Sequence, residues 1–227
     1  MNANNKWITG TKPNQPVSQV ARRAVDVRLK AVRTYLPLAA KKWKKDTEHV
    51  HQLRVATRRA RAALNVFANV LPRRKTRWMK RRLKEIRHAA GNARDLDVFG
   101  QRLASVMAAN PKSCLGNVVK LVAARRRAAQ LPLANVSKKA KRKELKKRSR
   151  ALVANAHWRG DIAEPVFGDE VTSYLAPLVD DFFDTSCRDL AETDELHRLR
   201  ISAKQLRYGM ELLDGGFDDS LRGELYT

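Results

Sequence analysis

At residues 51–61 the chain reads His-Gln-Leu-Arg-Val-Ala-Thr-Arg-Arg-Ala-Arg, and at residues 197–207 it reads His-Arg-Leu-Arg-Ile-Ser-Ala-Lys-Gln-Leu-Arg. Both stretches follow the pattern His-x-Leu-Arg-(Val/Ile)-x-x-(Arg/Lys)-x-x-Arg. The pattern places one histidine and three cations at positions i, i+3, i+7 and i+10. In the first copy these are His51, Arg54, Arg58 and Arg61, and in the second they are His197, Arg200, Lys204 and Arg207.

Each copy is predicted to form an amphipathic helix. With 3.6 residues per turn, the histidine and the three cations fall within a stripe roughly 80° wide. Apolar residues occupy the opposite side, namely Leu53, Ala60, Leu64 and Phe67 in the first copy and Leu199, Leu206, Met210 and Leu213 in the second. Neither copy contains an acid, and like charges three or four residues apart destabilise a helix. The stripe is therefore better suited to an anion lying along it.

A solvated arginine-rich surface is the simpler explanation for one such helix, but its recurrence at a distant site favours a binding role. The segment 73–90 gives a third amphipathic helix, with Met79, Leu83 and Ile86 on its apolar side. Its cationic stripe is roughly 120° wide on the same helical geometry. From this stripe we expect four residues to lie beside the two copies: Lys80, Arg81, Lys84 and Arg87.

The composition implies a polyanionic partner. The 227 residues include 47 Lys and Arg against 23 Asp and Glu, which gives a net charge of +24. Nucleic acid, a polyphosphate and an anionic membrane surface are the candidates. The two cysteines, Cys114 and Cys187, form no disulfide framework or zinc-site pattern, so no metal or cofactor is expected. Without an apolar signal region or a long apolar run, the default is a soluble cytoplasmic protein with no membrane attachment.

The remaining pattern predicts helices and no strand. A flexible, polar leader is expected over residues 1–16. Helices are then expected over about 17–35, to 70 after a cap at Asp46 or Thr47, and over 73–90, 95–108, 116–130, 174–190 and 193–214. Pro37 is expected to break or kink the first of them and Gly91 to close the third. The segment 137–150 holds nine Lys or Arg against one acid. A solvated basic helix or arm and a role in anion contact remain equally open for it.

These residues resemble a known family, the CHAD domain, or conserved histidine α-helical domain. Residues 51–61 are similar to the family's first signature, and residues 196–208, Leu-His-Arg-Leu-Arg-Ile-Ser-Ala-Lys-Gln-Leu-Arg-Tyr, are similar to its second. Gly-Asn-Ala-Arg-Asp-Leu-Asp-Val at 91–98 resembles the turn after the helix that follows the first signature. The resemblance covers most of the chain from about residue 17 onward.

The resemblance implies an all-α fold of two pseudo-symmetric helical halves, over about 17–110 and 111–227, whose basic faces line a shared central channel. It also implies binding of inorganic polyphosphate and association with polyphosphate granules, without a catalytic role. Carried over residue by residue, it places on the anion His51, Arg54, Arg58, Arg61, His197, Arg200, Lys204 and Arg207. A nearby anion favours the protonated imidazole of each histidine, so binding is expected to weaken as pH rises.

The second half is expected to be incomplete. Arg94 and Asp95 follow the first histidine, and their equivalents after the second copy would lie beyond Thr227. The last helices of the second half would then be missing. Such a half is expected to expose apolar surface, which a second copy of the chain could cover.

Two other classes of function compete with polyphosphate binding. Non-specific nucleic-acid binding fits the charge equally well, but aromatic residues make up only 6% of the chain and no known nucleic-acid-binding motif occurs. An enzyme acting on phosphate chains would need acidic ligands for Mg²⁺ or a nucleophile. Asp95 and Asp97 are the nearest acids, and we expect them to pair with arginines instead. A binding protein without catalytic activity is therefore favoured.

Overall fold

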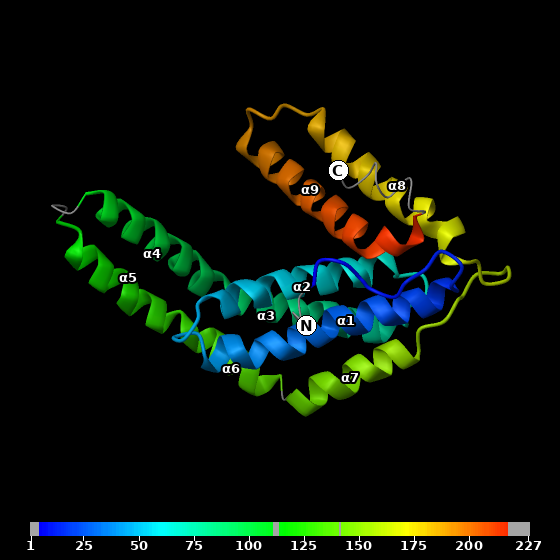
Figure 1. The fold of residues 1–227 in the computed structure, drawn as a ribbon, viewed down its shortest axis with the longest axis horizontal. Coiled ribbons are helices and arrows are strands. Elements are labelled where there is room, and N and C mark those ends of the chain that lie inside the picture. Colours follow the sequence, from blue (N-terminus) through cyan, green and yellow to red (C-terminus); the bar gives the residue numbers. More distant parts are fainter. Residues whose placement is uncertain (1–4, 111–113, 141, 218–227) are drawn as a thin grey trace.

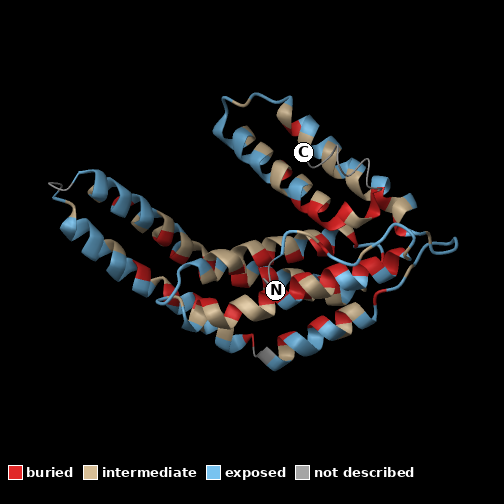
Figure 2. Cartoon of the chain, in the orientation of Figure 1, coloured by how far each residue is buried: buried red, intermediate tan, exposed pale blue. Residues whose placement is uncertain are grey.

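The computed structural model describes residues 5–110, 114–140 and 142–217, and within these residues it contains helices and no strand (Figure 1). The prediction of an all-α fold is confirmed. Buried residues concentrate where the central helices pack together, while the outer helices carry more exposed residues (Figure 2).

The centre of the fold is formed by α1 (Val17–Lys41), α2 (Glu48–Val66) and α3 (Arg73–Ala89). Helix α2 packs along α1 on one side and contacts α3 on another. The apolar face predicted for the first copy is buried in this core, with Leu53, Ala60, Leu64 and Phe67 at most 1% exposed. Burial of that face leaves the cationic stripe of α2 turned away from the core.

Two further helices, α6 (Gln130–Lys139) and α7 (Arg142–Ala154), pack against both α1 and α3. Their buried residues Leu133 and Leu152 belong to the same apolar core as α1, α2 and α3. The two pseudo-symmetric halves, with their boundary near residue 110, remain a prediction.

Two helical hairpins extend from this body. Helices α4 (Gly91–Ala109) and α5 (Gly116–Ala128) pair with each other and project from one end of it (Figure 1). Helices α8 (Phe167–Ser186) and α9 (Thr193–Leu213) form the second hairpin, and α9 contacts α2. A 3₁₀ turn, Asp214–Gly216, follows α9.

The apolar face predicted for the second copy is only partly buried. Leu213 is buried, but Leu199, Leu206 and Met210 have intermediate exposure. The neighbouring Ile201 is exposed by 44%. The reason is that α9 is anchored near its C-terminal end, while its first turns are flanked mainly by α8.

Several predicted boundaries were wrong. Helix α1 continues through Pro37 to Lys41, because a proline removes one backbone hydrogen bond without removing the packing that holds the helix. Gly91 does not adopt the left-handed conformation expected of a closing glycine; α4 begins there, directly after Ala90. The basic segment 137–150, for which a helix or an arm was left open, contributes to two helices, α6 and α7. At the start of α2 the side chain of Thr47, the N-cap residue, makes no capping hydrogen bond, whereas Asp46 Oδ1 accepts a hydrogen bond from the Glu48 N–H at 2.8 Å.

The described part of the expected leader, residues 5–16, is packed against the body. Ile8 is buried, and the carbonyl oxygens of Asn5 and Lys6 accept hydrogen bonds from Arg28 of α1 at 2.6 and 2.7 Å. This part of the segment is therefore anchored. Among the helices that the structure describes, none has the length and apolarity needed to cross a membrane.

Candidate functional site

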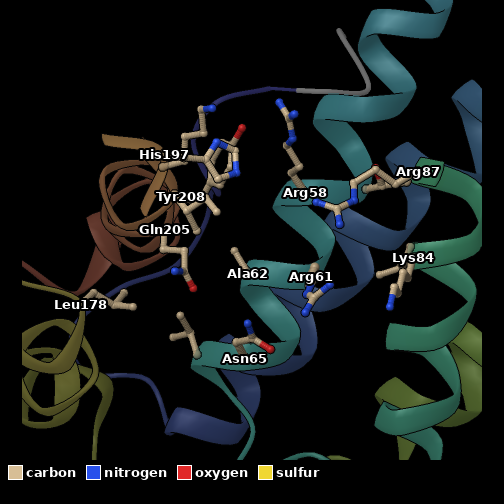
Figure 3. Close-up of a pocket in the computed structure, with 15 residues that line it drawn as sticks. Arg58, Arg61, Ala62, Asn65, Lys84, Arg87, Leu178, His197, Gln205 and Tyr208 are labelled. Atoms are coloured by element: carbon tan, nitrogen blue, oxygen red, sulfur yellow. The ribbon is translucent and has the colours of Figure 1, made fainter. Parts of the chain in front are cut away.

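A groove of about 570 Å³ lies between α2, α3 and α9. In Figure 3 side chains of α9 stand on one side of it, those of α3 on the other, and those of α2 between them. No acidic side chain is among the described residues that line the groove. Its basic lining residues come from all three helices: Arg58, Arg61, Lys84, Arg87, His197 and Lys204.

Helical spacing brings these side chains into the groove. Arg58 and Arg61 are three residues apart and share one side of α2, and Lys84 and Arg87 repeat this spacing on α3. On α9, His197 and Lys204 are seven residues apart, which is about two turns. The apolar faces of α2 and α3 are buried in the core, so their cationic faces are left to form the walls of the groove.

The cations are close enough to disfavour one another's charge. The pKa of Arg87 is lowered by burial and then by the charges of Arg61 and Arg58. Burial likewise lowers the pKa of Lys204, and the charges of Arg58, Arg200 and Arg207 lower it further. Arg58 therefore acts on both α3 and α9. An anion in the groove would relieve this repulsion.

His51 and Arg54 continue the cationic row towards the start of α2, outside the groove lining. Burial lowers the pKa of His51, and the charges of three neighbouring arginines lower it further, whereas the charge of Glu48 raises it. Arg54 Nη2 lies 4.0 Å from Asp95 Oδ1, and its Nη1 donates to the Ala90 carbonyl at 3.4 Å. Both residues remain partly exposed.

The other predicted site residues lie at varying distances from the groove. Lys80 lies near enough to the groove to interact with one of its lining residues, since burial and then the charge of Arg61 lower the pKa of Lys80. Arg200 and Arg207 act electrostatically on Lys204 without lining the groove. The Arg207 guanidinium lies 4.9 Å from the ring centre of Tyr208. Arg81 is exposed and neither lines the groove nor makes a contact that would place it there.

Sequence reasoning missed the uncharged polar residues of the groove. Asn65 follows Arg61 by four residues, and Tyr208 follows Lys204 by four, so helical spacing alone could have found both. Gln205 and Thr57 also line the groove. A search restricted to cations omitted these donors, which can add neutral hydrogen bonds to phosphate oxygens.

A buried acid beside the groove was also missed. Glu211 of α9 is 2% exposed and contacts arginines of α1 and α2. One of them, Arg28, is 1% exposed, and burial lowers its pKa to about 10, so it stays charged at neutral pH. Glu211 supplies the opposing charge that these arginines need.

The family model for the CHAD domain matches residues 23–225. The chain therefore belongs to the CHAD domain family, as its two signatures predicted. The comparison with curated proteins gives no match.

Solved structures share the fold. The chain is similar to the crystal structure of the CHAD domain from the plant Ricinus communis, with a TM-score of 0.71 and 19% identity, over 93% of this chain and 70% of that one. It is also similar to PptA from Streptomyces chartreusis, with a TM-score of 0.63 and 14% identity, over 90% of this chain and 77% of that one. At these identities the likeness concerns the fold.

Proposed function

We propose that this chain binds inorganic polyphosphate in the groove between α2, α3 and α9. The observation that carries the proposal is the set of six basic side chains from three helices, with no acid among the described lining residues. Family membership supports the same ligand class, because the resemblance to CHAD domains implies polyphosphate binding.

The chemistry of the lining suits a chain of phosphates. An arginine offers a planar fork for bidentate contacts with phosphate oxygens, and a lysine offers a compact charge. Arg58 lies between the cations of the other two helices, so a linear polyanion along α2 would meet positive charge on both sides. Neutralising this repulsion adds to the attraction of each contact.

We propose a binding role without chain cleavage. The two acids that could best hold Mg²⁺ near the cationic row are each engaged with an arginine. Asp97 is buried in an ion pair with Arg126, and Asp95 lies 4.0 Å from Arg54. We further propose that binding brings the protein to polyphosphate granules in the cytoplasm.

Removing the two α3 cations tests this function. Lys84→Ala with Arg87→Ala is expected to weaken polyphosphate binding by about 100-fold, because two charge-assisted contacts are lost. The matched control, Arg102→Ala with Lys120→Ala, removes the same net charge from exposed positions on α4 and α5 and should retain binding. Calorimetry at fixed salt, with circular dichroism as a check on folding, measures both. Equal losses in the two variants would show that only net charge matters.

A competition at the same salt concentration separates the ligand classes. Polyphosphate is expected to displace single-stranded DNA from the groove, since few aromatic side chains line it for base stacking. Preferential retention of DNA would contradict the proposed ligand.

A further inference from the structure

A second cationic surface lies on the outer face of α6 and α7. It consists of six exposed residues, Lys138, Lys139, Lys143, Lys146, Lys147 and Arg150. We refer to it as the α6–α7 face. These residues belong to the basic segment whose role the sequence left open.

The buried side of α7 fixes the direction of these cations. Leu145, Ser149 and Leu152 are at most 3% exposed and point to the core. With 100° per residue, Lys143, Lys146, Lys147 and Arg150 fall within about 100° on the opposite side. The charged side chains are therefore held outward by the packing of the helix, which makes the face a fixed row and not a mobile arm.

Acids of the described residues do little to compensate the charge of the face. The one acid of the segment, Glu144, pairs with Arg148. The Arg148 guanidinium in turn lies 4.4 Å from the ring centre of Trp78 on α3, so this pair is turned to the side of the helix. Among the residues that the structure describes, no carboxylate lies within 4.0 Å of any cation of the face.

The α6–α7 face is separate from the groove. Helices α6 and α7 pack against α1 and α3, whereas α9, which forms one wall of the groove, packs against α2 (Figure 1). The central helices thus lie between the two cationic surfaces. Figure 2 shows exposed residues along the outer side of α7.

We propose that the α6–α7 face binds the phosphate backbone of double-stranded nucleic acid without sequence preference. All six cations of the face are exposed, so a wide duplex can approach them. Each exposed lysine contributes little to the free energy of binding. A stiff polyanion loses less conformational entropy on binding than a flexible chain does, so the face favours the stiff one. Contacts to phosphates give affinity without reading bases.

Other polyanions fit the face less well. It has no aromatic side chain on which the bases of a single strand could stack. Attachment to an anionic bilayer usually combines basic with inserted apolar side chains. In α7 no large apolar side chain of the described residues is exposed, and in α6 Leu131 is 65% exposed. One such side chain offers little apolar surface for insertion into a bilayer.

The test is the salt dependence of binding to a DNA duplex of about 30 base pairs. The slope of log affinity against log salt is negative, and each phosphate contact adds about 0.9 to its magnitude. The variant Lys143→Gln, Lys147→Gln, Arg150→Gln loses three contacts, so its slope is expected to be shallower by about 2.7. Arg102→Gln, Lys120→Gln, Arg125→Gln removes the same charge from exposed positions on α4 and α5 and is expected to leave the slope unchanged. Glutamine keeps the helix propensity of α7 high, and circular dichroism checks it.

Each further arm has a decisive outcome. Duplex binding that survives in the Lys84→Ala, Arg87→Ala groove variant supports a separate site, and its loss there would overturn the proposal. Equal slope changes in the α7 variant and its control would also overturn it. So would loss of binding to phosphatidylserine vesicles in the α7 variant with duplex binding intact. The α7 variant is expected to bind polyphosphate as tightly as the wild type does. If the groove variant also keeps polyphosphate binding, the proposed function of the groove is wrong, but the proposal for the α6–α7 face is unaffected.

Discussion

Arg59 of α2 donates its Nε–H to Oε2 of Glu211 on α9 at 2.7 Å, and its Nη2 donates to Oε1 at 3.1 Å. The two side chains are 12% and 3% exposed. This bidentate pair joins the helices that carry the two sequence copies. It therefore contributes to holding α9 beside α2, and both helices line the groove.

Glu211→Gln is expected to destabilise the protein by about 3 kcal/mol, because it removes the buried carboxylate that contacts both Arg59 and the buried Arg28. Denaturant titration followed by circular dichroism measures the free energy of unfolding. The matched control is Glu195→Gln on the same helix, whose partners Arg188 and Arg198 are half exposed. The Glu195→Gln substitution should lower the free energy of unfolding by less than about 1 kcal/mol. Equal losses in the two variants would show that the buried pair has no special role in holding α9.

Removing charges that face each other across the groove should weaken polyphosphate binding most. Arg58→Ala with Lys204→Ala is expected to lower affinity by roughly 100-fold, at about 1.5 kcal/mol for each lost contact. Arg54→Ala with Arg200→Ala removes the same charge at positions outside the lining, and a smaller loss is expected. Calorimetry at one salt concentration ranks the two. The reverse ranking would move the site towards the start of α2 and α9.

The recurrence of one pattern was enough to predict the helices and the direction of their cationic faces. It worked for α2 because Leu53 and Leu64 have core partners on α1 and α3. It worked less well for α9, where Leu199 and Leu206 lack equivalent cover. Periodicity identifies an apolar face, but how much of that face is buried depends on neighbours that are distant in sequence.

Tertiary contacts explain what the sequence did not reveal about the site. Arg59 lies outside the repeated pattern, and its partner Glu211 is 152 residues away. Gly91 looked like a helix terminator, yet an added Cβ there would lie 3.4 Å from Arg54 Nη1. That distance is an ordinary van der Waals contact, so it marks how near the Arg54 guanidinium comes to the junction of α3 and α4. Neither relationship has a local signature.

Asp95→Asn is expected to raise polyphosphate affinity about threefold, because Arg54 would lose the carboxylate that lies 4.0 Å from its Nη2. Fluorescence titration with and without the substitution measures the change. The same samples, incubated with Mg²⁺, should show no shortening of polyphosphate on a gel. Shortening by the wild type that disappears in Asp95→Asn would instead identify a catalytic carboxylate.

Polyphosphate binding is expected to strengthen as pH falls from 8 towards 5.5. Burial holds the pKa of His51 below its usual value, and the charges of Arg94, Arg58 and Arg54 lower it further. Bound polyanion offsets these charges and raises the pKa, so binding takes up a proton at any pH between the free and bound values. Between those two pKa values, affinity should rise by up to about tenfold for each pH unit of acidification. It should level off once the pH is below the pKa of the free protein.

His51→Asn tests this account of the pH dependence, with His88→Asn on the exposed side of α3 as the matched control. An NMR titration of the His51 ring should show its pKa rising on addition of polyphosphate, and calorimetry at pH 8 and pH 5.5 should show a smaller affinity ratio in His51→Asn than in His88→Asn. Because both substitutions remove one imidazole, a difference between them reports position and not composition. An identical affinity ratio in the two variants would mean that the proton is taken up elsewhere, and that His51 lies beyond the reach of the bound chain.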